Sequence, residues 1–244
     1  MKLIRAYSDL HGRLPIIEKC DTLLLAGDLA GVEGDHNPHF QLNYIHGIFT
    51  DWCNYLLESV CHEIVMIPGN HDFWAEIPYK KEVKLPEGVT FLVDEGTDTL
   101  AGLSVYGSPW VPNLPRWAYY GAAHQLDLQA KSMPEGYDIW LMHGPPYMIC
   151  DGVRPTGPHV GNGFINKAVR QKKPKYYICG HIHEAYGKDY LGHTNVLNVS
   201  FLDDMYEPKW RHGVIAIEEG QDPVGFMNMK DQDNPKQLFY HSGE

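Results

Sequence analysis

Nine side chains in this 244-residue sequence combine residue types and spacings that suit the binding of metal ions. They fall into five short clusters along the chain: Asp9 and His11; Asp28; Asn70, His71 and Asp72; His143; and His181 with His183. Together they offer carboxylate and amide oxygens and imidazole nitrogens, but no thiolate. Such ligands favour Mn, Fe, Zn, Ni or Co over a structural zinc site built on cysteines.

The order of these clusters carries more information than any one of them. Asp-x-His and Gly-Asp pairs arise often by chance, and the GNHD sequence at 69–72 also suits an ordinary turn. The GHIH sequence at 180–183 is the most specific single motif, although two surface histidines would look the same. The complete ordered set is very hard to explain as coincidence.

Each cluster follows a short run of apolar or mixed residues that ends in a polar turn. The runs cover residues 3–7, 22–26, 64–67, 139–142 and 176–179. They are too short for helices and are stopped by Gly, Pro or polar residues, so they predict β-strands. Because side chains at the ends of strands in an open α/β sheet converge on one crevice, clusters far apart in the chain are expected to meet.

Helices are predicted between several of these strands. Apolar residues recur at three- and four-residue steps over 40–60, and a shorter helix over 164–172 has Asn162 as its candidate cap. Further strands are predicted at 89–93, 103–106, 196–199 and 214–217, without obvious helices between all of them. This mixture favours an α/β sandwich of two sheets over a purely parallel sheet.

The composition is that of a globular protein, with 43% hydrophobic and 21% charged residues. A net charge of −11 argues against tight binding to duplex nucleic acid, which needs clustered Lys and Arg. Five cysteines without a CxxC pair predict free thiols. No apolar stretch reaches the roughly 18 residues of a membrane helix, and the start of the chain lacks a signal-peptide pattern. These features predict a cytoplasmic protein that does not enter a membrane.

The sequence shows no repeat or long linker, so we expect one domain over residues 1–244. Residues from about 219 to 244 are polar with scattered apolar side chains, and are expected to form a C-terminal extension or capping segment. The sequence does not indicate an oligomeric state.

The ordered motifs DxH, GD, GNHD, His and GHxH resemble those of the calcineurin-like metallophosphoesterase superfamily, and the resemblance runs from Asp9 to His183. It implies a four-layer α/β/β/α sandwich of two mixed β-sheets flanked by helices, and a site for two divalent ions with manganese first among the candidates. It also implies the ligands. One ion would be bound by Asp9, His11 and His183, the second by Asn70, His143 and His181, and both by the bridging residue Asp28. His71 is implied as the proton donor or phosphate-orienting residue, with Asp72 as its partner.

Three further segments resemble the animal metallophosphoesterase-domain-containing proteins and their bacterial relatives: YGSPW at 106–110, HGPP at 143–146 and GHIHEAYG at 180–187. That group implies metal-dependent hydrolysis of small phosphodiesters, with cyclic nucleotides among the candidate substrates. The protein phosphatase branch fits less well, because its Asp-Arg-Gly element is replaced here by the sequence that follows Asp28. A phosphomonoesterase, a protein phosphatase and a metal-bound module without activity remain the alternatives.

The predicted reaction follows from charge. Two cations neutralise the phosphoester, and the hydroxide that bridges them attacks phosphorus in line. His71 then protonates the leaving oxygen or stabilises the transition state, an effect typically worth about 10²–10⁴-fold. Among the remaining residues, Trp74, Trp110 and Tyr147 are candidates either for stacking on a base or for ordinary packing, and Arg154 either for binding phosphate or for solvent.

Overall fold

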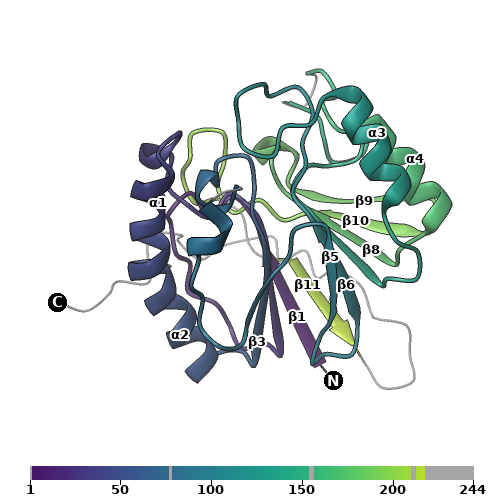
Figure 1. Cartoon of the computed structure of the whole chain (residues 1–244). Helices are drawn as coiled ribbons and strands as arrows, with labels where there is room; N and C mark the ends of the chain where they lie inside the picture. The colour runs from purple at the N-terminus through teal and green to yellow at the C-terminus, as the bar shows by residue number, and fades with distance from the viewer. Residues whose placement is uncertain (1, 77–78, 154–156, 210–212, 218–244) are drawn as a thin grey trace.

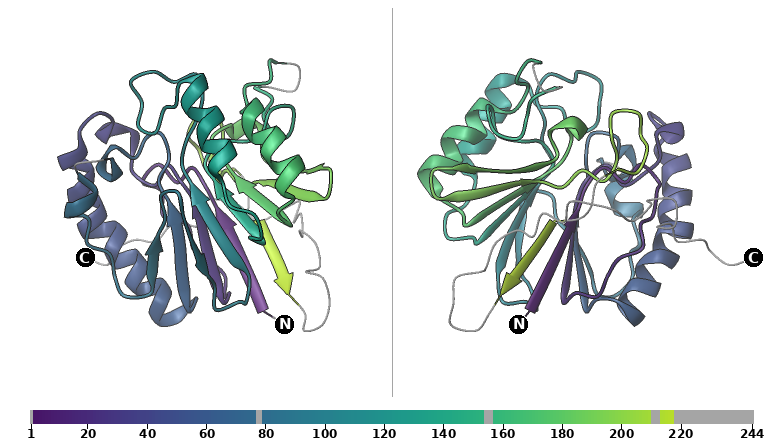
Figure 2. Two further views of the ribbon diagram at one scale, coloured as in Figure 1. Left: turned by 45° about the vertical axis from the view of Figure 1, so that its right-hand side comes forward. Right: turned by 180° about the vertical axis from the view of Figure 1, so that it is seen from behind.

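The computed structural model describes residues 2–76, 79–153, 157–209 and 213–217 (Figure 1). The predicted capping segment at 219–244 and the candidate Arg154 therefore lie outside the described residues. Within them, the chain forms two β-sheets that stack face to face, with helices on both outer sides (Figure 2). This is the four-layer α/β/β/α arrangement that the sequence predicts.

The first sheet has the order β11-β1-β2-β3-β4. Its strands are β1 (Lys2–Tyr7), β2 (Thr22–Ala26), β3 (Glu63–Ile67), β4 (Val89–Phe91) and β11 (Gly213–Ile217). Neighbours pair in parallel except β11, which runs antiparallel to β1. The carboxyl ends of β1, β2 and β3 therefore lie at one edge, where three of the sequence clusters begin.

The second sheet has the order β5-β6-β7-β8-β10-β9. Its strands are β5 (Glu95–Asp98), β6 (Ser104–Ser108), β7 (Ile139–Met142), β8 (Tyr176–Cys179), β9 (Gly187–Leu191) and β10 (Thr194–Asn198). The four central strands pair in parallel, whereas β5 and β9 are antiparallel edge strands. The carboxyl ends of β7 and β8 supply the other two clusters.

Helices cover the two outer faces, as Figures 1 and 2 show. On the first sheet lie α1 (Pro38–Tyr44), a π-type turn η2 (Ile45–Phe49) and α2 (Thr50–Ser59), and on the second lie α3 (Ala123–Ser132) and α4 (Gly163–Lys172). Four 3-10 turns complete the elements: η1 (Val32–Gly34), η3 (Phe73–Ala75), η4 (Tyr79–Glu82) and η5 (His183–Ala185).

Alternation along the strands explains the layers. In β2, Leu23 and Leu25 pack toward α1 and α2, whereas Leu24 and Ala26 face the second sheet. Successive strand side chains point to opposite faces, so a strand that is apolar throughout can serve two cores. The sequence run at 22–26 is apolar from Leu23 to Ala26, and all five of its residues are buried.

The helix predicted over 40–60 is interrupted. Gly47 has non-helical backbone angles (φ −101°, ψ −109°), which divide the segment into α1, η2 and α2. Its predicted apolar stripe still packs on the first sheet through Leu42, Phe49 and Trp52. The cap predicted for α4 is present, because Asn162 accepts hydrogen bonds from the backbone N–H groups of Phe164 and Ile165.

The two sheets are joined at the edge where the clusters gather. Beyond the end of β1, the Ser8 N–H donates to the Val199 carbonyl at 3.0 Å, and the Phe201 N–H donates to the Ser8 carbonyl at 2.8 Å. This seam holds the carboxyl end of β1 against that of β10. Among the described residues, no helix is long and apolar enough to cross a membrane.

Candidate metal centre

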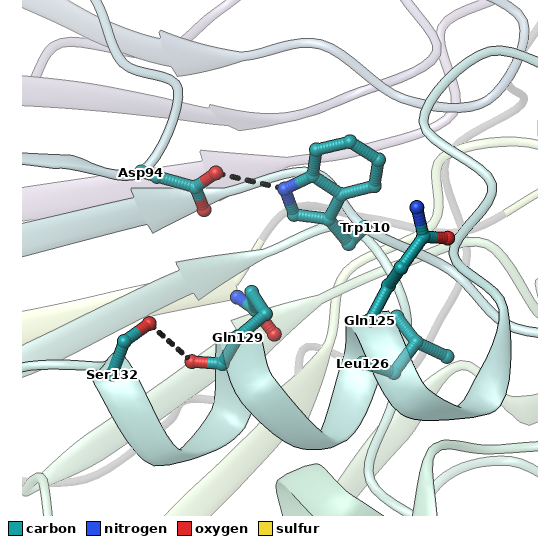
Figure 3. Close-up of a pocket in the computed structure, with 6 residues that line it drawn as sticks. All are labelled: Asp94, Trp110, Gln125, Leu126, Gln129 and Ser132. Carbon is teal, nitrogen blue, oxygen red and sulfur yellow. Dashed lines mark hydrogen bonds between the residues drawn. The ribbon is translucent and has the colours of Figure 1, made fainter.

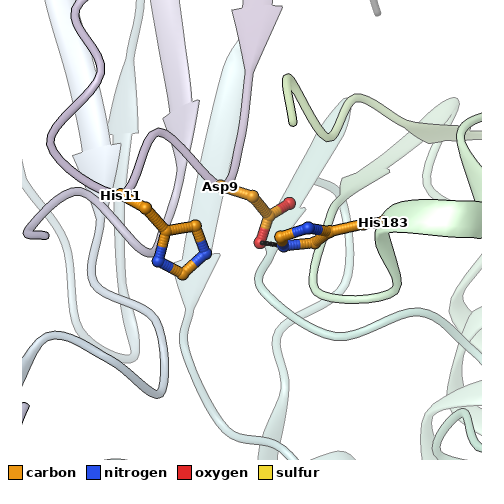
Figure 4. Close-up of side chains that lie close together, drawn as sticks. All are labelled: Asp9, His11 and His183. Atoms are coloured by element: carbon orange, nitrogen blue, oxygen red, sulfur yellow. Dashed lines mark ion pairs between the residues drawn. The ribbon is translucent and has the colours of Figure 1, made fainter. Parts of the chain in front are cut away.

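The seven side chains predicted as ligands come together at the joined edge of the two sheets. Asp9, His11 and His183 form one group whose ligand atoms lie within 4.8 Å of one another (Figure 4). Asp28, His143 and His181 form a second group by the same measure. The Asn70 Oδ1 lies 3.0 Å from His143 Nε2, which adds the amide to the second group. The grouping matches the division of ligands that the resemblance implies.

Asp28 lies between the two groups. Its Oδ2 is 3.3 Å from His143 Nε2 and 3.6 Å from His11 Nε2. A carboxylate that reaches a histidine of each group has the position required of a bridging ligand. His11, Asp28 and His71 also form a third group of this kind, so His71 lies within reach of the same carboxylate.

Backbone carbonyls set the histidine rings for metal binding. The Nδ1 atoms of His143 and His183 each contact a carbonyl at 2.8 Å, that of Ala26 and that of Asp203 respectively. A carbonyl only accepts, so each Nδ1 carries a proton and each Nε2 faces the groups described above. Metal-binding histidines are typically fixed in this way.

The ring nitrogens of His11 show the fit most directly. Both are buried, and neither has a hydrogen-bond partner among the described residues. Leaving buried polar atoms unsatisfied is costly, and a metal ion beside Asp9, His11 and His183 would remove that cost for one of the two nitrogens. The donor set therefore fits a pair of divalent ions.

The carboxylates are held by their own donors. Asp9 accepts from the His181 N–H at 3.0 Å and from the Ser200 hydroxyl at 2.7 Å. Asp28 Oδ1 accepts from the His71 N–H at 2.8 Å. These bonds orient the carboxylates before any ion arrives, as ligand carboxylates usually are.

The four histidines of the site fall into two classes by the direction of their pKa shifts. Burial lowers the pKa of His11 to about 4, and burial together with the nearby His143 lowers the pKa of His181 to about 3. Burial also acts against charge on His143 and His183, but the carboxylates of Asp28 and Asp9 raise each pKa to about 9. Burial opposes ionisation of Asp9 and Asp28 in turn, yet the neighbouring histidines lower both pKa values. The two buried carboxylates thus call for positive charge, which divalent ions provide.

Four of the seven predicted ligands have left-handed backbone, with φ of 57° at Asp9, 42° at His11, 54° at Asp28 and 69° at His181. Such conformations are uncommon outside glycine and concentrate at functional sites. They turn the chain sharply at the strand ends. Two residues separated by one position, such as Asp9 and His11, can therefore reach the same pocket.

Glycines make room for these turns. A side chain at Gly69 would run into the Asp28 carboxylate, and one at Gly180 would run into Ser8 and Asp9. This close approach explains the glycine that precedes Asn70 and the one that precedes His181. The GN and GH motifs therefore need glycine at their first position for lack of space.

Comparison with known proteins settles the family. The family model described as calcineurin-like phosphoesterase matches residues 2–185, which is most of the chain. The chain belongs to the calcineurin-like phosphoesterase family. The predicted superfamily is therefore confirmed. The family depends on metal ions, and this chain carries His and Asp groups that could bind them.

Curated relatives agree with this assignment. The chain is 36% identical to human metallophosphoesterase domain-containing protein 1 over 112 residues, which cover 45% of this chain and 34% of that protein. It is 26% identical to UPF0046 protein C25E10.12 of Caenorhabditis elegans over 218 residues, covering 81% of this chain and 73% of that one. The match thus spans about a third of the human relative's length.

A solved crystal structure supports the fold. It aligns with a TM-score of 0.62 at 15% identity, over 88% of this chain and 94% of its own. At this identity the likeness concerns the fold alone.

In this calcineurin-like phosphoesterase, the partner of His71 differs from the predicted one. His71 Nδ1 lies 2.9 Å from Asp35 Oδ1 and 3.0 Å from Asp35 Oδ2, whereas the expected partner was Asp72. Burial acts to lower the pKa of His71, but the charges of Asp28 and Asp35 raise it overall. The expectation for Asp72 was wrong because Asp35, at the end of η1 and 36 residues away in the chain, reaches the His71 ring instead.

Asp72 instead ties two ligand-bearing loops together. Its buried carboxylate accepts from the N–H groups of Leu29 at 3.0 Å, Ala30 at 3.0 Å and Gly69 at 2.8 Å, and from Trp74 Nε1 at 3.0 Å. Burial, with the charge of Asp28, raises the pKa of Asp72 to about 6. The residue supports the positions of Asp28 and Asn70 rather than the reaction.

We expect Asp72→Ala to destabilise the protein by about 3 kcal/mol, because several buried N–H groups lose their acceptor at once. Denaturant unfolding of the metal-free protein measures this change. Asp51→Ala, at an exposed position on α2, is the matched control and should change stability by less than about 0.5 kcal/mol. An Asp72→Ala protein as stable as the control would contradict the supporting role.

The candidate stacking residues lie in three different settings. Trp74 is fully buried and bonded to Asp72, so it packs in the core. Tyr147 is 44% exposed and lies against His159. Trp110 donates through Nε1 to Asp94 at 2.8 Å and lines a pocket of about 300 Å³ beside α3 (Figure 3). None of the residues that line this pocket is a predicted ligand.

Proposed function

We propose that this protein is a metal-dependent phosphodiesterase that hydrolyses small phosphodiesters, with cyclic nucleotides among the candidate substrates. The observation that carries the proposal is Asp28, which reaches a histidine in each of two ligand groups. A pair of ions held close together suits phosphoester hydrolysis, because it neutralises the phosphate and clamps both the attacking and the leaving oxygen.

The side chains divide the work as follows. When bound, divalent ions supply charge neutralisation and lower the pKa of water that they coordinate. Asp28 fixes the distance between the two ligand groups. His71, held at Nδ1 by Asp35, presents Nε2 to the leaving oxygen and donates a proton to it. Asp35 orients that ring and stabilises its cationic form.

One feature of the sequence favours a diester over a monoester. Leu29, Ala30 and Gly31 follow Asp28 where protein phosphatases carry an Asp-Arg-Gly element, so no arginine is supplied there for the extra charge of a monoester. The net charge of −11 also disfavours tight binding to duplex nucleic acid and points to a small substrate.

All five cysteines are free thiols, which supports placing this activity in the cytoplasm. Manganese is the first metal to test, because the oxygen and imidazole ligands suit it.

The proposal predicts faster cleavage of bis-p-nitrophenyl phosphate than of p-nitrophenyl phosphate in the presence of manganese. The measurement is kcat/KM for both esters, repeated with Fe, Co, Ni and Zn, followed by a panel of cyclic and linear nucleotides. The opposite ranking would favour a phosphomonoesterase or protein phosphatase. Bound metal without turnover of either ester, under any of the five metals, would favour a module that binds but does not catalyse.

A further inference from the structure

A tyrosine outside every sequence motif lies against the metal centre. Tyr206 is in the turn that follows β10, and its ring centroid is 4.8 Å from that of His11 and 5.5 Å from that of His183, edge-on to both. Its residue is 38% exposed, so the ring covers these two histidines while part of it still faces solvent.

The backbone of Tyr206 is strained. Its φ of 60° lies in the left-handed region, where a bulky residue is a genuine outlier. Strain of this kind persists only where surrounding contacts enforce it, and it clusters at functional sites. The turn therefore holds the Tyr206 ring in place through an unfavourable backbone conformation.

Asp203 enforces the conformation. Its carboxylate accepts from the N–H groups of Met205 at 3.0 Å and Glu207 at 3.2 Å, and its carbonyl accepts from the Tyr206 N–H at 2.9 Å. The same carbonyl accepts from His183 Nδ1. One peptide group thus sets both a ligand ring and the ring that covers it.

The phenol of Tyr206 supplies a hydrogen-bond donor beside the centre. A tyrosine hydroxyl is protonated near neutral pH, so it can donate a hydrogen bond without carrying charge. The ring that carries it lies against His11 and His183. A phosphate bound on that side of the centre would therefore meet a neutral donor.

A second aromatic ring closes the opposite end. The Trp117 centroid is 4.3 Å from that of His71, and the centroids of His71 and His11 are 4.7 Å apart. The four rings run in the order Trp117, His71, His11 and Tyr206, with two histidines of the centre between two partly exposed aromatic side chains. The two partly exposed rings thus lie on either side of the two histidines.

We propose that Tyr206 is a substrate-positioning residue, whose ring forms the wall over His11 and His183 and whose hydroxyl donates a hydrogen bond to a non-bridging phosphate oxygen. The inference rests on the proposed phosphodiesterase function. It places the phosphate on the side of the centre where His11 and His183 lie, next to this donor. Packing alone would need the ring but not the hydroxyl, and that difference can be tested.

The test compares Tyr206→Phe with Tyr190→Phe, a matched control on the exposed edge strand β9. Binding of inorganic phosphate to the manganese-loaded proteins is measured by calorimetry, together with bound metal and the KM and kcat for bis-p-nitrophenyl phosphate. A hydrogen bond to a charged group is worth roughly 10–100-fold in affinity. We expect Tyr206→Phe to weaken phosphate binding and raise KM by about that factor, with metal content unchanged and kcat changed less.

The outcomes separate this inference from the proposed function. Phosphate affinity and KM equal to those of the wild type in Tyr206→Phe would overturn the role of the hydroxyl, even if Tyr206→Leu released metal by removing the wall. If the wild type cleaved neither test ester, the phosphodiesterase proposal would fail. The phosphate-binding comparison would still decide whether Tyr206 holds a phosphate.

Discussion

Asp28→Asn is expected to abolish hydrolysis of bis-p-nitrophenyl phosphate and to lower bound manganese from two ions to at most one per chain. The substitution keeps the size of the side chain and an oxygen that can still accept from the His71 N–H. It removes the charge that faces His11 and His143 and one of the oxygens needed to bind two ions at once. Elemental analysis after dialysis against manganese, with steady-state kinetics on the same sample, measures both effects.

Asp51→Asn is the matched control for this change. Asp51 is exposed in the first turn of α2 and is not among the residues of the ligand groups, so activity and metal content should match the wild type. Full occupancy of two ions in Asp28→Asn would remove the bridging role. A protein that lost both ions and its thermal transition would instead show that the charge is needed for folding.

His71→Gln is expected to lower kcat by about 10²–10⁴-fold while both ions stay bound, because a positioned proton donor is worth that much. Asp35→Asn should lower kcat in the same direction by a smaller factor, since the ring loses its charged partner. When the two changes are combined, Asp35→Asn should add nothing to His71→Gln, because the aspartate acts only through the histidine.

Metal analysis decides between two roles for His71. The ring lies within reach of Asp28 and His11 and could itself be a ligand, in which case His71→Gln would release an ion. Asp72→Asn provides the comparison for the aspartate. If it reproduced the kcat defect of His71→Gln and Asp35→Asn did not, the assignment of Asp35 as the partner would be wrong.

The sequence predicts the central strands, and identifies the candidate ligands that follow them, because both depend on local signals. A buried strand such as β2 is apolar from Leu23 to Ala26 and stops at Gly27, and those features can be recognised without knowledge of the rest of the chain. Glycines that allow close approach and polar residues at strand ends are equally local. The structure accordingly brings together all seven residues predicted as ligands, from five segments of the chain.

Contacts between loops were not predictable in the same way. Asp72 is adjacent to His71 in sequence, yet its carboxylate points to the backbone of residues 29 and 30. Asp35 is 36 residues from His71 and reaches its ring through the fold. Tyr206 has no motif around it. What distinguishes it is its left-handed backbone angle, which is seen in the structure and not in the sequence.

Three regular elements also escaped prediction. The edge strands β5 and β9 are short and largely exposed, so they lack the apolar pattern that identifies a strand. The helix α3 has only two buried residues, Leu126 and Ala130, which is too few to give a clear period. These elements form through pairing and packing with neighbours rather than through their own composition.

The seam at Ser8 gives the centre a mechanical property. Asp9, Asp28 and Asn70 follow strands of one sheet, while His143, His181 and His183 follow strands of the other, so each ion pocket draws on both sheets. The spacing of the two pockets is then set by the offset of one sheet over the other, which the Ser8 bonds to Val199 and Phe201 fix at one edge. Substitutions in the layer between the sheets, such as at Val65 or Leu141, would shift one sheet relative to the other. The distance between the two ion pockets would then change although no predicted ligand had been altered.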